Sequence, residues 1–217
     1  MIPFSASAHA EFREAEVRHQ WAEELYGLID QASREGARGW ILDLRGNGGG
    51  YLGPMLAGAQ PLLGEGKLLE LRGPDAKNTY SIKHGAVLNH FGFAQTSVEE
   101  SLPLSTPVPR LHRQPVAILI DHATASGAES LAIAFRGRPH TIFIGEPTSG
   151  LTSSGTYWDL PDGAVLSIMS QQVYDRRGQS YPEGIQPDLK VADPASIPVI
   201  SADPSVVAAQ DWLANQP

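Results

Sequence analysis

The chain of 217 residues contains no cysteine, which excludes disulfides, thiol catalysis and cysteine-ligated zinc. Basic residues are scarce as well: 16 lysines and arginines stand against 24 acidic residues, and no basic run could follow a phosphate backbone. No apolar run approaches the roughly 20 residues of a spanning helix, and no signal-peptide core follows Met1. We therefore expect neither nucleic-acid binding nor a membrane span, and the localisation stays open.

Hydrophobic residues make up 41% of the sequence, enough for the core of one large domain, and we expect residues 1–217 to form a single domain. Helical periodicity alternates with short apolar runs typical of buried strands. The expected helices cover residues 9–34, 51–64 and 128–137, and the expected strands cover 39–45, 115–121 and 140–146. This alternation favours an α/β fold with a largely parallel sheet.

Three further segments complete the expected domain. Residues 67–114 are polar and punctuated by proline and glycine, which predicts a hairpin or a lid-like insertion. Residues 155–178 alternate around Pro161-Asp162-Gly163, a pattern typical of a β-hairpin. Residues 203–217 predict a short closing helix that starts at Asp203-Pro204.

Charged residues suggest structural rather than catalytic roles at two places. Asp43 and Arg45 are expected to form an ion pair at a strand end, and Asp175, Arg176 and Arg177 are expected in a solvated turn. No group of histidine, aspartate and glutamate has the spacing of metal ligands, so we expect neither a metal nor an organic cofactor.

Two turns of small residues follow expected strands: "GNGGG" at 46–50, and "TASGAES" around Ser126. Ligands of open α/β sheets bind where strands end and helices begin. The glycine loop is either a close-approach loop or a plain tight connection, and it lacks the spacing of a phosphate loop. Ser126 is either a helix cap or a nucleophile beside oxyanion-binding amides, although Thr124 and Ala128 replace the glycines of a G-x-S-x-G elbow.

Five motifs taken together point to a family. "WILDLRGNGGG", "TASGAES", "IGEPTSG", "LPDGAVLSI" and "EGIQPDLKV" resemble, in this order, the catalytic core of the tail-specific (C-terminal-processing) serine proteases, over about residues 39–191. The resemblance implies a crotonase-like (ClpP-type) fold, a peptide or protein substrate, and a fold in which homo-oligomers are common. It also implies that Ser126 is the nucleophile and that the amides of Gly127 and Gly49, with Gly48 as the alternative, form the oxyanion hole.

The general base departs from the family pattern. In the tail-specific branch a lysine follows "GE-x-T-x-G" directly, but Leu151 stands at that position here and cannot accept a proton. The chain is therefore more similar to the tricorn-like branch, in which a histidine activates the serine and a late glutamate assists. Glu183 is the candidate for that glutamate, with an exposed turn carboxylate as the alternative. The histidine of that branch precedes an Ile-Pro segment, so we expect it upstream of Ile2-Pro3, in a part of the core that this chain lacks.

None of the seven histidines stands out as a replacement base: His9, His19, His84, His90, His112, His122 and His140. The peptide-binding PDZ domain usual in the family is missing from the sequence, and the family's location is often periplasmic or extracellular. The favoured function is therefore a serine-type peptidase with an acyl-enzyme on Ser126. The alternatives are a catalytically inactive module that binds a small molecule or peptide on the same fold, and acyl-CoA chemistry that needs the oxyanion amides but not Ser126.

Overall fold

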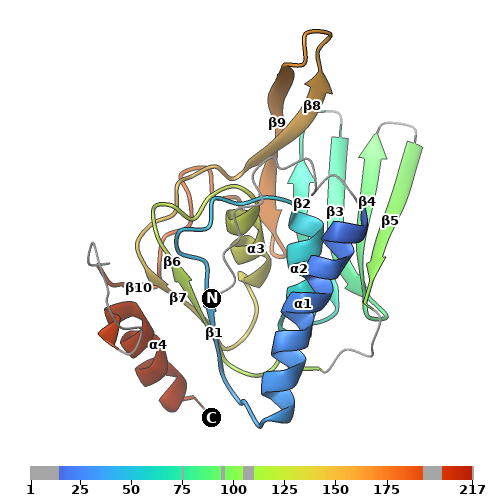
Figure 1. Ribbon diagram of the computed structural model, residues 1–217. Coiled ribbons are helices and arrows are strands. Elements are labelled where there is room, and N and C mark those ends of the chain that lie inside the picture. The colour runs from blue at the N-terminus through green and yellow to red at the C-terminus, as the bar shows by residue number, and fades with distance from the viewer. Residues whose placement is uncertain (1–14, 75, 94–95, 105–109, 193–201, 217) are drawn as a thin grey trace.

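The computed structural model describes residues 15–74, 76–93, 96–104, 110–192 and 202–216, and these form two sheets with helices between and around them (Figure 1). The helices are α1 (Ala15–Arg34), α2 (Leu52–Leu63), α3 (Gly127–Phe135) and α4 (Pro204–Ala214). The parallel sheet, in the order β1-β6-β7-β10, contains β1 (Trp40–Asp43), β6 (Val116–Ile120), β7 (Thr141–Gly145) and β10 (Leu189–Lys190). The predicted α/β class with a parallel sheet is confirmed.

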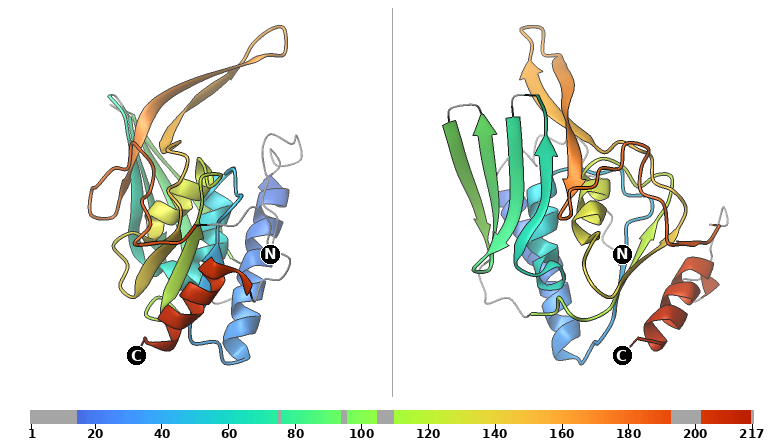
Figure 2. Two further views of the ribbon diagram at one scale, coloured as in Figure 1. Left: turned by 90° about the vertical axis from the view of Figure 1, so that its left-hand side faces the viewer. Right: turned by 180° about the vertical axis from the view of Figure 1, so that it is seen from behind.

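The second sheet is antiparallel, in the order β5-β4-β3-β2-β9-β8. Its strands are β2 (Gly66–Arg72), β3 (Ala76–Lys83), β4 (Ala86–Phe93), β5 (Thr96–Pro103), β8 (Ser153–Asp159) and β9 (Val165–Asp175). The 67–114 segment supplies β2 to β5, and β2 pairs with β9, so this segment and the predicted hairpin share one sheet. The hairpin of β8 and β9 projects beyond the rest of the chain, as two further views show (Figure 2).

The central strand β6 explains why the run "PVAILID" has no polar alternation. All five of its residues are buried, because both faces of the parallel sheet are covered. Ala117 and Leu119 pack in the cluster beneath α4, whereas Ile118 and Ile120 face the main core with α2 and α3. Since β1 and β6 are parallel neighbours, their carboxyl ends meet at one edge of the sheet, and the two small-residue turns therefore lie together there.

The predicted ion pair of Asp43 and Arg45 is confirmed, and it has a third member. The Nη2 atom of Arg45 lies 2.7 Å from a carboxylate oxygen of Asp43 and 2.7 Å from one of Asp203. Asp203 also caps α4, because its side chain accepts from the N–H groups of Ser205 and Val206. The pair therefore fixes the start of the closing helix against the end of β1.

The predicted solvated turn at Asp175-Arg176-Arg177 is wrong. Asp175 is only 2% exposed, because its carboxylate accepts from the N–H groups of Arg177 and Gln179 and from the hydroxyl of Tyr181. Arg176 donates to the carbonyl of Ala134 at the end of α3. Burial, and then the hydrogen bond to Asp175, raise the pKa of Tyr181 above its ordinary range. A local charge pattern cannot reveal that this turn packs on α3.

A buried carboxylate joins β2 and β3 of the antiparallel sheet. Glu70 on β2 accepts from Lys77 on β3 at 2.9 Å and from Arg72 at 2.5 Å, and Lys67 lies 3.5 Å away. Burial alone would raise the pKa of Glu70, but the hydrogen bonds from Lys77 and Arg72 and the positive charges outweigh it and lower the pKa from 4.5 to about 2. The ionised carboxylate therefore stabilises the folded state.

We predict that Glu70→Gln lowers the free energy of unfolding at neutral pH by on the order of 1 to 2 kcal/mol, since solvent screens the exposed cations. Because the folded pKa lies below the unfolded one, this stabilisation is complete above about pH 4.5 and is lost as the pH falls towards 2. Urea unfolding across this range measures it, with Glu65→Gln, an exposed carboxylate nearby, as the control. If the Glu70→Gln variant still had a lower free energy of unfolding than the unaltered protein at about pH 2, the prediction would be contradicted.

Candidate active site

The turns that follow β1 and β6 are tied together by hydrogen bonds. The carboxylate of Asp121 accepts from the N–H of Gly46 at 3.0 Å and from the N–H of Thr124 at 2.9 Å. The Thr124 hydroxyl donates to the carbonyl of Leu44, and the N–H of Ala125 donates to the carbonyl of Asn47. The glycine loop and the serine turn therefore form one unit, which neither sequence motif alone could show.

Ser126 occupies the N-cap position of α3 in an unusual backbone conformation. Its φ of 53° is positive, a region that a serine adopts only when its surroundings impose it. The Ser126 N–H donates to Oε2 of Glu129 at 3.0 Å. Ser126 and Glu129 thus form a capping box, in which the Ser126 side chain faces the backbone N–H of Glu129. Within the part of the chain that the structure describes, no side chain hydrogen-bonds to the Ser126 hydroxyl. A strained serine at a strand-to-helix turn is the geometry in which a nucleophile is presented.

The glycine loop approaches the start of α3 so closely that a side chain would not fit. A Cβ on Gly49, which has a φ of +100°, would lie 2.6 Å from the carbonyl oxygen of Ala125 and 2.7 Å from the amide nitrogen of Gly127. A Cβ on Gly127 would overlap the carbonyl oxygen of Gly50, whereas a Cβ on Gly48 would meet nothing within 4 Å. The structure thus brings Gly49 and Gly127 beside Ser126.

The two amides differ in their hydrogen bonding. As the first residue of α3, Gly127 has an N–H with no partner inside the helix. The N–H of Gly49 donates to Oδ1 of Asn47 at 2.9 Å. Gly127 is therefore the freer donor, and Gly49 would have to exchange its partner to bind an oxyanion.

Glu129 is the residue whose role the sequence did not indicate. Its carboxylate is fully buried and accepts from the N–H of Ser126, the hydroxyl of Thr148 at 2.5 Å, the hydroxyl of Ser149 at 3.2 Å and the N–H of Gly150 at 2.9 Å. The signal was present, since Glu129 is the one charged residue in the apolar helix "GAESLAIAF". It joins the serine turn to the loop at 148–150.

Leu151 and Glu183 lie on two segments that meet at this loop. The Thr148 hydroxyl accepts from the N–H of Ile185 at 2.8 Å, and a Cβ on Gly150 would lie 3.4 Å from the carbonyl carbon of Glu183. Leu151 is 58% exposed, and Glu183 is exposed too. Leu151, which stands where the resemblance implies a lysine, therefore lies close to the candidate glutamate Glu183.

None of the described histidines hydrogen-bonds to Ser126. The His122 side chain is 83% exposed, and its Nδ1 lies 3.7 Å from the Glu146 carboxylate. His19 pairs with Glu23 on α1. His9 lies outside the described residues. The other described histidines are on the surface or beside a cavity at the far end of α3, and they are His84, His90, His112 and His140. No group of three or more metal-ligating side chains gathers among the described residues.

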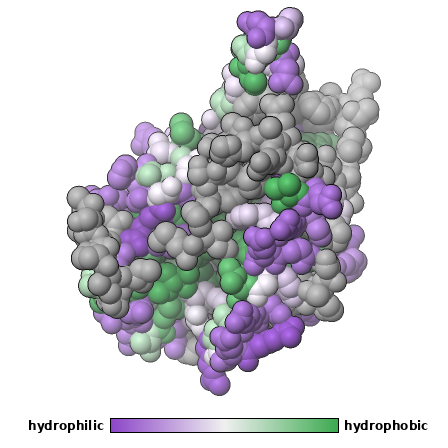
Figure 3. Space-filling view, in the orientation of Figure 1, coloured by the Kyte–Doolittle hydropathy of each residue, from purple (hydrophilic) through white to green (hydrophobic). Residues whose placement is uncertain are grey.

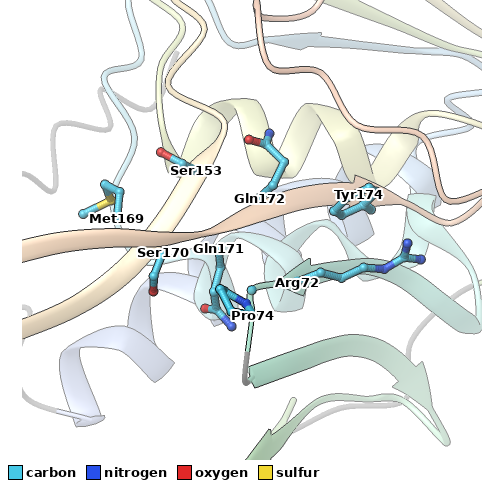
Figure 4. Close-up of a pocket in the computed structure, with 9 residues that line it drawn as sticks. Arg72, Pro74, Ser153, Met169, Ser170, Gln171, Gln172 and Tyr174 are labelled. Atoms are coloured by element: carbon cyan, nitrogen blue, oxygen red, sulfur yellow. The ribbon is translucent and has the colours of Figure 1, made fainter.

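An open cleft of about 510 Å³ lies at the base of the hairpin, where β2 ends and β9 continues (Figure 4). The Arg72 guanidinium lies over the ring of Tyr174 at 4.2 Å, and the buried Nε2 of Gln171 has no partner among the described residues. The pairing of β2 with β9 covers only Gln172 to Asp175, and Gly73 packs against Ser170 and Gln171. In the described structure the edge of β9 on the β2 side is therefore open from Val165 to Met169.

The hairpin above this cleft exposes large apolar side chains to solvent. In the space-filling view its tip carries hydrophobic and hydrophilic residues side by side (Figure 3). The exposed apolar residues are Trp158, Leu160, Val165, Leu166, Ile168 and Met169. A projecting two-stranded ribbon of this kind is typical of a surface that contacts another molecule.

We predict that Gly49→Ala lowers the free energy of unfolding by at least about 2 kcal/mol, because the new methyl group would overlap Gly127 at a positive φ. The matched control is Gly48→Ala, where a Cβ meets open space, and it should change stability by less than about 1 kcal/mol. Chemical denaturation of both variants measures the difference. An equal loss of unfolding free energy in Gly49→Ala and Gly48→Ala would contradict the close approach of Gly49 to Gly127.

A second prediction concerns the buried carboxylate. Glu129→Gln should lower the free energy of unfolding by roughly 2 kcal/mol or more, because one carboxylate oxygen becomes an NH₂ group that faces hydrogen-bond donors. Ser149→Ala, which removes only the longest of the four bonds, should cost less than about 1.5 kcal/mol. Urea denaturation of the two variants tests this, and a neutral Glu129→Gln variant would refute it.

Comparison with known proteins agrees with this geometry. The profile of Peptidase family S41 matches residues 8–191. The chain is 32% identical over 180 residues to the nisin-resistance protein of Lactococcus lactis subsp. lactis, covering 82% of this chain and 50% of that protein. It is 28% identical over 185 residues to the carboxy-terminal processing protease CtpA of Bacillus subtilis, covering 84% and 35%. The chain thus spans half or less of the length of these curated relatives.

The fold is also shared with a solved structure, that of a lipoprotein from Streptococcus agalactiae. The TM-score is 0.68 at 23% sequence identity, and the match covers 93% of this chain and 62% of that one. No described helix is long and apolar enough to cross a membrane. The predicted fold class and the family resemblance are both confirmed. The chain belongs to peptidase family S41, the family that contains the carboxy-terminal processing proteases.

Proposed function

We propose that the chain is the core of a serine peptidase that cleaves peptide or protein substrates through an acyl-enzyme on Ser126. The observation that carries the proposal is the strained Ser126 at the N-terminus of a buried helix, with the Gly127 amide and the glycine loop against it. Nucleophile and oxyanion donors meet in this way in serine hydrolases. Membership of a peptidase family supports peptide bonds as the substrate.

The proposed reaction has two stages. The Ser126 hydroxyl oxygen attacks the peptide carbonyl carbon while a base takes its proton, and the carbonyl oxygen becomes an oxyanion. The N–H groups of Gly127 and Gly49 stabilise that charge, once Gly49 is released from Asn47. One such donor lowers the activation barrier by on the order of 3 kcal/mol. The amine leaves with the proton, and water then hydrolyses the acyl-enzyme. Glu129 positions Ser126 through its backbone N–H and does not touch the substrate.

The proposed base is a histidine outside the described residues, assisted by Glu183. Leu151 cannot take a proton, and none of the described histidines hydrogen-bonds to Ser126. Glu183 is exposed on the segment that packs against Gly150, and Gly150 in turn donates to Glu129. A carboxylate so placed can accept a hydrogen bond from an incoming imidazole and orient it.

The substrate is proposed to bind as an extended strand along the open edge of β9. Beyond Gly73, that edge has no β2 partner from Val165 to Met169, and Met169 also lines the cleft. An extended peptide can pair with such an edge, which gives affinity with little dependence on sequence. The exposed apolar side chains of the hairpin would supply contacts for alternate side chains of the substrate.

The first test is labelling with a fluorophosphonate, read by intact-protein mass spectrometry. We expect a chain extended upstream of Met1 to be labelled at Ser126, and the Ser126→Ala variant of it to be unlabelled. The control is Ser101→Ala, an exposed serine on β5 away from the proposed site, which should leave labelling unchanged.

The outcomes separate the proposed functions. Labelling of the 217-residue chain itself would place the base within it, whereas labelling of the extended chain alone would place the base upstream. If neither chain is labelled, the peptidase proposal is overturned in favour of a binding module, for which Leu151 at the lysine position is the supporting feature. Thioester hydrolysis that survives Ser126→Ala would instead indicate acyl-CoA chemistry.

A further inference from the structure

A second cavity, of about 500 Å³, lies at the opposite end of α3 from Ser126. Its walls come from the C-terminal end of α2, the turn between β3 and β4, and the segments that precede β6 and β7. Because α3 has nine residues, about 13 Å of helix separates its two ends. The cavity is therefore distinct from the candidate active site.

The lining of this cavity is strongly cationic. Arg110, Arg138 and Arg176 line it together with His84 and His112, and Glu65, an exposed residue, is the one carboxylate among its lining residues. Within the described ranges, no carboxylate forms an ion pair with Arg138 or Arg176. The lining therefore holds more cationic than anionic side chains, while the charge of Asp175 acts on Arg176 from outside the lining.

Arg138 forms the buried part of this wall. It is only 5% exposed, and its guanidinium donates to backbone carbonyls, among them Leu62 at 2.6 Å and Gln114 at 2.5 Å. Burial, and then the charge of Arg176, lower the pKa of Arg138 to about 10. A buried cation without a counter-charge is costly, and an anion in the cavity would offset that cost.

Two buried polar groups at the cavity lack partners. Gln60 is 2% exposed, and neither its amide nitrogen nor its amide oxygen has a hydrogen-bond partner among the described residues. The buried Nε of Arg176 likewise has none there. Because more than about 90% of buried polar groups in proteins are paired, unpaired donors at the wall of a cavity point to a ligand that supplies acceptors.

We propose that this cavity binds a small molecule that carries an oxyanion, either a phosphate or a carboxylate group, and a hydroxyl. The oxyanion accepts from Gln60 Nε2 and Arg176 Nε and is attracted by Arg110, and the hydroxyl donates to Gln60 Oε1. Arginine is well suited to such anions because its donors match their geometry. The site is independent of Ser126 and of the proposed peptidase activity.

The test is isothermal titration calorimetry of the 217-residue chain with inorganic phosphate and with citrate, a hydroxylated carboxylate, at neutral pH. Potassium chloride at matched ionic strength is the control for general screening. We expect saturable binding of one equivalent and a rise in melting temperature that the chloride does not produce. Binding of phosphate alone assigns a phosphate ligand, and binding of citrate alone assigns a carboxylate ligand. If neither binds saturably, the proposal is overturned.

Variants locate the binding. Gln60→Leu should weaken the affinity at least about tenfold while leaving the melting temperature without ligand unchanged or higher, since it replaces unpaired polar atoms by apolar ones. Arg110→Ala should weaken it as well. The matched control is Arg113→Ala, an exposed arginine that does not line the cavity, which should keep the affinity within about twofold. Equal weakening by the two arginine variants, or unaltered binding by Gln60→Leu, would refute the site.

Discussion

A carboxylate without exposed surface must be surrounded by donors, and Glu129 gathers four of them from two separate segments. One donor is the N–H of Ser126, and the other three belong to the loop at 148–150. The strained conformation of Ser126 and the shape of that loop are thus held by the same buried charge. Because the loop also binds the segment at Ile185, the position of Glu183 depends on it as well.

The proposed mechanism depends on the segments that Glu129 holds together. The loop that donates to Glu129 leads directly into the exposed Leu151, which cannot accept a proton. In the proposed mechanism, the exposed Glu183 on the adjoining segment and the strained Ser126 at the helix start still require a proton acceptor. A histidine from outside the described residues would complete the set without any change in the core.

The two proposals place different chemistry at the two ends of α3. Its N-terminus carries Ser126 and the Gly127 amide, which has no partner inside the helix and suits a transient oxyanion. Near its C-terminus, Arg138 and Arg176 donate to backbone carbonyls and line a separate cavity in which cationic side chains outnumber the single carboxylate. A small anion bound there would join the ends of α2 and α3, and thereby stabilise the helical layer on which the serine turn rests.

Local pattern in the sequence was enough for much of this protein. Features that depend on neighbouring residues could be predicted, and these are the apolar run of β6, the turn at Pro161-Asp162-Gly163 and the cap at Asp203. The family and the pairing of Asp43 with Arg45 could be predicted as well. The strand β10 was missed because two residues carry no periodicity.

Tertiary structure alone decided the rest. The burial of Asp175 against α3, the donors that the loop at 148–150 supplies to Glu129 and the unpaired amide of Gln60 could not be predicted from the sequence. Each depends on how separate segments pack together, and a hydrophobic pattern indicates which residues are buried but not which polar groups meet there.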